Sequence, residues 1–336
     1  MNNSVFSLRL LSDDDRLRVI KSFDYLQLIS FSFISTKTKS LVESFNLNIR
    51  SFDVRVSGAL NISIYPDVDG HYIEFSSFQD TNRGPREPPS DLSFIPSKMR
   101  VRSDMEDYDR YEDIKWQNPI LSFSLWFYHV CGLFKCNNCH ISFDEEREYF
   151  DTIALRNLLS QWKLLHITQA SRDHAQKIIK LFTPIVEEMF PMHSITHLEC
   201  PQRFMIHNFK FLSITEDINL DDALAANASC ITFMKFTVSN ANRFLRSWVR
   251  GSNPRLRKAY IRIEGPMNQD TILKGITHQI MPEDLVREWD AREHPRGGVD
   301  IRNKKGILAT LTNTRGVSAE LYISQIANKV TMYVKE

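Results

Sequence analysis

The hydrophobic positions near the N-terminus fall at helical spacing. Leu17, Ile20 and Phe23 lie on one face of a stretch that begins at Ser12, and three aspartates follow this serine directly. Serine is a favoured N-cap residue, and carboxylates in the first turn complement the helix dipole. The pattern therefore predicts a short helix that starts just after Ser12.

Two more short helices are predicted behind the first. Asp24 and Gln27 have the spacing of a capping box, and Ser35 or Thr36 is suited to cap the third helix. Seven of the ten residues 25–34 are apolar, and they lie on all sides of the second helix. A helix that is hydrophobic on every side is normally buried on every side. Three short helices form too small a core for this, so the surplus must face the rest of the chain or another protein.

From residue 50 to 78 the apolar positions alternate with polar ones, which is the spacing of strands. Turn residues at 57–58 and 66–70 divide this region into short antiparallel strands. The next segment, 79–113, is rich in proline and acidic residues. It is predicted to be a solvated loop or linker.

Helical and strand patterns alternate after residue 114. Strands are predicted at 164–168, 196–200, 209–214, 230–238 and 258–264. The later ones recur at intervals of roughly 20–30 residues, which is typical of an α/β domain of irregular leucine-rich-repeat type. The expected fold class is therefore α+β or α/β, with three N-terminal helices, a β-rich connector and a repeat-like C-terminal domain.

Local patterns add detail to the C-terminal part. Residues 239–256 predict a helix capped by Ser239 and ended by Gly251, with an apolar stripe formed by Ala241, Phe244, Leu245 and Trp248. Residues 297–311 predict a hairpin that turns at 303–306, and residues 330–334 predict a closing strand.

Charge and composition narrow the class of protein. The 42 basic residues nearly balance the 41 acidic ones, so there is no electrostatic case for binding nucleic acid or a membrane surface. Residues 116–134 carry no charge, but their apolar part is shorter than a spanning helix needs, and they predict a buried core helix. The five cysteines and the absence of a signal-like start indicate reduced thiols in the cytoplasm or nucleus.

Four residues resemble a metal or haem motif: Cys131, Cys136, Cys139 and His140. The last three match the C-x-x-C-H pattern of haem attachment, and with Cys200 the cysteines have a ferredoxin-like spacing. Their neighbours are mostly aromatic and aliphatic, so buried thiols are the favoured interpretation and a metal or haem site the alternative. No cofactor is expected.

Two other groups have simpler interpretations. His193 and His197 are four residues apart, but they lie around a predicted strand and lack the glutamate of a zinc-protease helix, so they are expected to be structural. Seven bases without an intervening acid predict a solvated face or a docking site for an acidic partner: Arg243, Arg246, Arg250, Arg255, Arg257, Lys258 and Arg262. No catalytic motif is recognised, so the protein is not expected to be an enzyme.

Two regions resemble known domains. FSLRLLSDDDRLRVIKSFDYLQLISFSFISTKTKSLV (6–42) resembles the F-box of the large nematode F-box family. The C-terminal half resembles the F-box associated domain type 2 through NRFLRSWVRGSNPRL (242–256), ILKGI (272–276) and GGVDIRNKKGILATL (297–311). This resemblance implies an F-box at 1–48, a connector at 49–113 and a substrate domain at 114–336, with the associated domain at about 180–311.

The resemblance also implies a function. The protein would be the non-catalytic substrate receptor of an SCF-type (cullin–RING) ubiquitin ligase. Its F-box would bind a Skp-type adaptor, and through it a cullin, while the C-terminal domain recruits an unknown target protein. The family's pattern implies these adaptor-facing positions: Leu11, Leu17, Ile20, Phe23, Leu26 and Leu28.

The chain departs from the family's pattern at three positions. Ser7 and Ser12 stand where the family usually has proline, and Asp15 stands where F-boxes often have an aliphatic residue. Ser12 is able to replace proline as a helix cap. The alternative function is an interaction module with a degenerate F-box that acts outside ubiquitin ligation.

Overall fold

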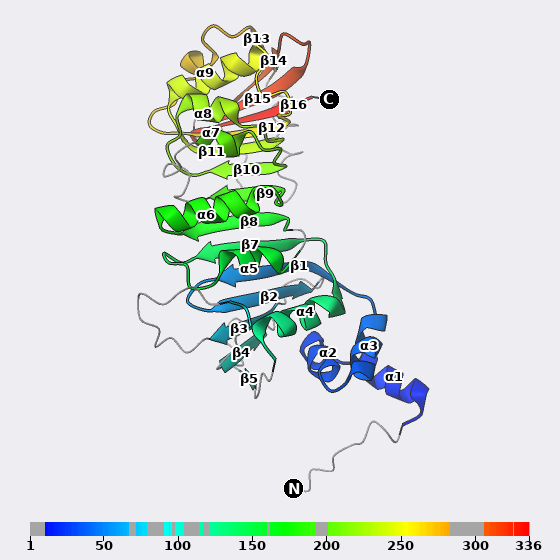
Figure 1. Cartoon of the computed structure of the whole chain (residues 1–336). Coiled ribbons are helices and arrows are strands. Elements are labelled where there is room, and N and C mark those ends of the chain that lie inside the picture. Colours follow the sequence, from blue (N-terminus) through cyan, green and yellow to red (C-terminus); the bar gives the residue numbers. More distant parts are fainter. Residues whose placement is uncertain are drawn as a thin grey trace. The chain divides into compact units, whose positions relative to one another are not determined.

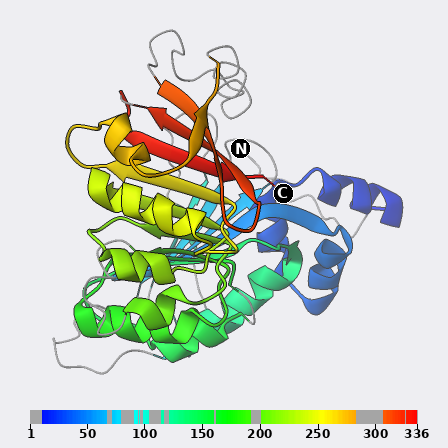
Figure 2. The same cartoon turned by 90° about the horizontal axis from the view of Figure 1, so that it is seen from above.

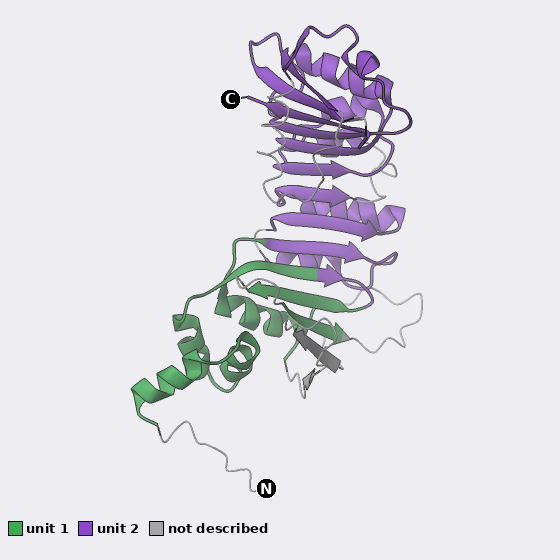
Figure 3. Cartoon of the chain, turned by 180° about the vertical axis from the view of Figure 1, so that it is seen from behind, with its two compact units in different colours: residues 1–54, 59–138 green, residues 55–58, 139–336 purple. Residues whose placement is uncertain are grey.

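The computed structural model describes residues 11–66, 72–78, 91–93, 95, 98–103, 114–116, 121–159, 162–191, 201–282, 306–324 and 326–335 (Figure 1). The chain divides into two compact units (Figure 3). Unit 1 comprises residues 1–54 and 59–138, and unit 2 comprises residues 55–58 and 139–336. The predicted domain boundary at residue 113 therefore falls inside unit 1.

Unit 1 begins with the three predicted helices, α1 (Asp13–Lys21), α2 (Tyr25–Ser32) and α3 (Thr36–Ser44). Their caps are those expected from the sequence. Ser12 caps α1, Asp24 and Gln27 form a capping box on α2, and Ser35 caps α3. Local side chains thus supply acceptors for backbone N–H groups that a helix start leaves unpaired.

A sheet follows in unit 1, with strand order β1-β2-β3-β4-β5. Its strands are β1 (Leu47–Val56), β2 (Leu60–Pro66), β3 (Ile73–Phe78), β4 (Lys98–Ser103) and β5 (Ile114–Trp116), and β6 (Phe134–Lys135) pairs with β1. The expected strands between 50 and 78 are confirmed. The prediction of a loop throughout 79–113 is wrong for β4, where Met99 and Val101 alternate with polar residues and pair with β3.

Helix α4 (Phe123–Leu133) completes the core of unit 1. It buries Phe123, Trp126, Phe127, Val130 and Leu133. The Trp126 ring lies 4.7 Å from that of Phe75, and the Phe127 ring lies 5.4 Å from that of Phe52. The predicted core helix within 116–134 is confirmed. Within the described ranges, no helix has the length and hydrophobicity to cross a membrane.

In its described residues, unit 2 has six parallel strands that follow one another in chain order, then four antiparallel ones. The parallel strands are β7 (Cys139–Asp144), β8 (Leu164–Gln169), β9 (Glu188–Pro191), β10 (Phe211–Ile214), β11 (Cys230–Phe236) and β12 (Lys258–Ile263). The antiparallel ones, in order after β12, are β16 (Lys329–Val334), β15 (Ser318–Ser324), β14 (Gly306–Thr312) and β13 (His278–Ile280).

Helices connect the parallel strands, as a parallel sheet requires. They are α5 (Thr152–Asn157), α6 (Arg172–Phe182), α7 (Pro201–Met205), α8 (Leu220–Ala225) and α9 (Val238–Val249), and α10 (Gln269–Leu273) packs beside α9. In Figure 2 these helices line one side of the unit's strands. Figure 3, from behind, shows the strands in front, with no described helix of unit 2 over them. We call this side the helix-free face.

Most of the predicted elements of unit 2 are confirmed. The strands expected at 164–168, 209–214, 230–238, 258–264 and 330–334 correspond to β8, β10, β11, β12 and β16. The strand expected at 196–200 lies outside the described residues. Strands β7, β9, β13 and β15 were not predicted. The combination of helices with a large mixed sheet agrees with an α+β class, while the likeness to leucine-rich repeats stays a prediction.

The turn predicted at 303–306 lies outside the described residues except for Gly306, which pairs with Ser324 at the start of β14. A turn follows β14, where the N–H of Gly316 donates to the carbonyl of Asn313 at 2.9 Å. The predicted cap of α9 is wrong, because Thr237 caps this helix and Ser239 does not. Residues 297–305 lie outside the described part of the chain.

Candidate functional site

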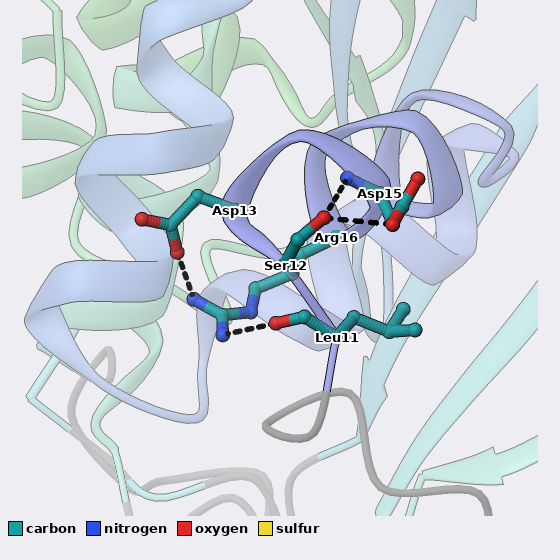
Figure 4. Close-up of polar contacts among 5 residues, drawn as sticks. All are labelled: Leu11, Ser12, Asp13, Asp15 and Arg16. Atoms are coloured by element: carbon teal, nitrogen blue, oxygen red, sulfur yellow. Dashed lines mark hydrogen bonds and ion pairs between the residues drawn. The ribbon is translucent and has the colours of Figure 1, made fainter.

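Helix α1 starts from a hydrogen-bonded pair (Figure 4). The Ser12 hydroxyl accepts from the N–H of Asp15 at 3.2 Å and donates to its Oδ2 at 2.7 Å. Arg16 donates to Oδ1 of Asp13 at 2.9 Å and to the carbonyl of Leu11 at 3.1 Å. Two departures from the family's pattern, Ser12 and Asp15, therefore act together to begin the helix.

Helix α2 is partly covered by α4 of the same unit. The Ser32 hydroxyl donates to the carbonyl of Ile29 at 2.6 Å, so it accepts from Nε2 of His129, 2.8 Å away. This fixes the proton of the neutral imidazole on Nε2. The Phe33 ring stacks on that imidazole at 4.0 Å. Burial lowers the pKa of His129, which keeps the contact neutral.

The structure separates the six predicted adaptor-facing residues into two groups. Ile20 (0% exposed) and Leu28 (5% exposed) are buried within the chain itself. The other four are half-buried and keep part of their surface accessible: Leu11, Leu17, Phe23 and Leu26. Ile34, which the sequence did not single out, is 70% exposed just after α2. The helices thus present apolar surface beyond what their own chain covers.

The described residues of the cysteine motif do not come together as a ligand set. Cys139 and His140 are the first two residues of β7, so their side chains point to opposite faces of the strand. Burial raises the pKa of the Cys131 thiol, which disfavours the thiolate that metals bind. In the part of the chain that is described, no three His, Cys, Asp or Glu side chains form a group suited to a metal. Cys200, His193 and His197 lie outside that part.

The run of bases between 243 and 262 is divided between two faces of unit 2. Helix α9 packs its apolar stripe on the sheet, with the Phe244 ring 5.4 Å from that of Phe233. Its arginines at 243, 246 and 250 are exposed on the outer side. On β12, Lys258 and Arg262 alternate with buried Ala259 and Ile261. Lys258 and Arg262 therefore project from the helix-free face, opposite α9.

Register aligns side chains in rows across the helix-free face. One row crosses β7 to β12 with a residue from each strand, and all six are half-buried: His140, Leu164, Glu188, Phe211, Cys230 and Lys258. The Phe211 ring stacks on that of Phe190 at 4.7 Å. We call Phe190 and Phe211 the phenylalanine pair.

Two lysines and two tyrosines gather where β12 meets β16. The Lys258 Nζ lies 4.8 Å from the ring centre of Tyr260 and 4.3 Å from that of Tyr333. The Lys329 Nζ lies 4.6 Å from the ring centre of Tyr260. The two phenol oxygens are 3.4 Å apart. These are cation–π contacts, and we call the four residues the lysine–tyrosine cluster.

The sequence alone did not reveal a buried asparagine that connects the end of α9 to the end of α8. Asn253 follows α9 with a φ of 50°, and its amide donates to the carbonyls of Leu224 (3.3 Å) and Ala226 (2.6 Å) at the end of α8. Asparagine tolerates the left-handed region better than most residues. Its position before Pro254 was the available signal, since Asn-Pro marks a turn.

Comparison with known proteins points to the same region. Residues 200–261 match the model of the F-box associated family. The F-box associated domain-containing protein sdz-33 of Caenorhabditis elegans is 39% identical over 62 residues, which are 18% of this chain and 21% of the relative. The chain thus spans about a fifth of the length of that relative. No solved structure matches the chain.

The matched segment runs through α7, β10, α8, β11, α9 and β12. It lies inside the region 180–311 to which the sequence resemblance pointed. It includes Asn253 and half of the lysine–tyrosine cluster, Lys258 and Tyr260. Residues 200–261 are therefore similar to the F-box associated domain of a nematode protein.

Proposed function

We propose that this protein is the non-catalytic substrate-recognition subunit of an SCF-type (cullin–RING) ubiquitin ligase. The match of residues 200–261 to the F-box associated family carries the proposal. Three capped helices in the same chain support it, because they have the place and pattern of an F-box. The Ser12–Asp15 pair also supports it, since α1 begins without the family's usual proline.

In this proposal, α1–α3 bind a Skp-type adaptor and, through it, a cullin. The half-exposed apolar side chains of Leu11, Leu17, Phe23 and Leu26 would be buried in that interface. Burial of apolar surface yields about 25 cal/mol per Å², so a contact shared with the adaptor would be stable. Unit 2 would hold the target protein close to a ubiquitin-charged enzyme and act by proximity, in the cytoplasm or nucleus.

The test is co-purification of the full chain with a Skp-type adaptor. Leu17→Asp places a charge on the half-exposed face of α1 and is expected to abolish co-purification, because an unpaired carboxylate would be buried in the interface. Leu125→Asp is the matched control, since it makes the same change at a leucine that is 58% exposed on α4. Leu28 is unsuitable for this test because it is buried within the chain.

Each result has a distinct meaning. Loss of the adaptor by the Leu17 variant alone, with unchanged circular dichroism, would support the receptor function. Failure of the wild-type chain to bind any Skp-type adaptor would contradict it. The protein would then be an interaction module with a degenerate F-box, outside ubiquitin ligation.

A further inference from the structure

A cavity of about 680 Å³ lies in unit 1, where β6 leaves β1. The two strands pair at Asn48 and Lys135. The chain then returns to β1 at Asn138, whose Nδ2 donates to the carbonyl of Arg50 at 2.9 Å and whose carbonyl accepts from the N–H of Phe52 at 3.0 Å. The cavity opens between these two contacts, and its lining consists of residues 48–50 and 134–138.

The lining of this cavity carries two cations and no carboxylate. Arg50 and Lys135 are both exposed, and no ion pair joins either of them to a described carboxylate. The Arg50 guanidinium lies 5.9 Å from the ring centre of Tyr65 on β2, which is a cation–π distance. This contact limits the freedom of the arginine side chain before a ligand arrives, which lowers the entropy cost of binding.

Strand geometry directs the two cations to the same side. Asn48 and Arg50 are exposed on either side of buried Ile49, so both point away from it. Lys135 is in register with Asn48 in the parallel pair and therefore points to the same side. From the spacing of strands and of alternate residues, the Arg50 and Lys135 backbones are about 8 Å apart. Their long side chains are thus able to contact one anion between them.

A phosphate monoester fits this lining better than a carboxylate does. It carries about −1.5 to −2 charge at pH 7 and three acceptor oxygens, which match two cations and an asparagine amide. A guanidinium also binds two phosphate oxygens at once. Ile49 and Phe134 are only 6% and 7% exposed and add an apolar part to the lining. The volume lies in the range of small-molecule sites, about 300–1,000 Å³, so there is room for an organic group beside the phosphate.

We propose that this cavity binds a small phosphorylated organic molecule, as a phosphate monoester. Arg50 and Lys135 bind the phosphate group, and the amide of Asn48 donates to one of its oxygens. The organic group lies against Ile49 and Phe134. The site needs neither an adaptor nor a target protein, so this proposal is independent of the proposed function.

Calorimetric titration of the full-length protein with phenyl phosphate tests the proposal. The salt concentration should be about 150 mM, where screening suppresses contacts beyond about 8 Å. Arg50→Gln with Lys135→Gln is expected to weaken binding at least tenfold, because both cations are removed. Lys135→Arg keeps the charge and should stay within threefold of the wild type.

The matched control removes two other cations of unit 1. Lys21→Gln with Lys37→Gln alters exposed lysines outside the cavity lining, and its affinity should stay within twofold of the wild type. Cys136, a half-buried free thiol of the lining, reports the place of binding. Saturating phenyl phosphate should slow its alkylation by N-ethylmaleimide at least fivefold. Cys230, a half-buried free thiol in unit 2, should react at an unchanged rate.

Several outcomes would overturn the proposal. The role of charge would be wrong if phenol bound as tightly as phenyl phosphate, or if the variant without Arg50 and Lys135 kept the wild-type affinity. The place would be wrong if phenyl phosphate left the alkylation of Cys136 unchanged. The occupant would be wrong if inorganic phosphate bound as tightly as phenyl phosphate, or if a phosphoserine peptide bound at least tenfold more tightly. A wild-type chain that bound none of these probes would also contradict it.

Discussion

Glu145 is an ionisable residue that the fold buries almost completely, just beyond β7. Its side chain is 4% exposed, and burial is the main reason why its pKa rises to about 8, with the backbone of Tyr149 opposing the shift and Glu148 adding to it. A carboxyl group with this pKa keeps its proton through the neutral range. The stability of unit 2 therefore depends on the proton of the Glu145 carboxyl group, which no sequence pattern predicted.

The free energy of unfolding should depend on pH because of this proton. In the unfolded chain the carboxyl group has the ordinary glutamate pKa of 4.5, whereas in the folded chain burial raises this pKa to about 8. The contribution of the protonated Glu145 to the free energy of unfolding is complete below pH 4.5. It decreases by up to about 1.4 kcal/mol per pH unit as the pH rises, and it is lost once the pH has risen through 8. Glu145→Gln should remove this part of the slope in urea denaturation between pH 5 and 8.5.

The neighbouring Glu146 provides the control for that measurement. It is exposed, so Glu146→Gln should leave the slope of the wild type intact. A Glu145 variant whose stability falls with pH as steeply as that of the wild type would contradict the assignment of the proton.

At the scale of elements, helices and strands were predicted most accurately from the sequence where contacts between neighbouring residues determine them. The starts of α1, α2 and α3 were found because Ser12, Asp24 and Ser35 cap them through neighbouring residues. Tertiary contacts decided the rest. Strand β9 has only four residues and is recognisable by its pairing with β8 and β10. The turn between β14 and β15 was not predicted and is recognisable by the pairing of the two strands.

The same distinction applies to the candidate site. The apolar surplus of α2 was visible in the sequence, but its division between the chain and a partner was not. Burial of Leu28 and exposure of Ile34 depend on how the helices pack. The lysine–tyrosine cluster joins residues 258–260 to residues 329–333, and only the register of β12 with β16 brings them together.

The start of α1 offers a test at this scale. Ser12→Ala should destabilise the protein by about 1 kcal/mol, because the first turn loses its cap. Asp15→Ala should cost less in the Ser12→Ala background than in the wild type, because the two side chains share a hydrogen bond. The coupling is measured as the non-additive part of the unfolding free energies in a double-mutant cycle. Additive effects would contradict the pairing.

At the scale of the whole molecule, the two segments that carry the proposed function belong to different compact units. The exposed apolar side chains of α1–α3 lie in unit 1, and the matched residues 200–261 lie in unit 2. Each unit has its own buried residues.

This division predicts that damage to the proposed adaptor surface stays within unit 1. Leu17→Asp should abolish co-purification with the adaptor and leave the folding of unit 2 unchanged, because the two units have separate buried residues. Pull-down measures the first effect, and hydrogen exchange of the amides in unit 2 measures the second. Loss of exchange protection throughout unit 2 in this variant would contradict the prediction.

The alternation along β12 has a consequence for how such proteins diversify. Ala259 and Ile261 hold the strand against α9, whereas Lys258, Tyr260 and Arg262 project to the other side. Substitutions at the projecting positions alter the surface chemistry of this face and leave the packing beneath it unchanged. A duplicated gene can therefore change that surface chemistry at every second residue of a few strands, at little cost in folding.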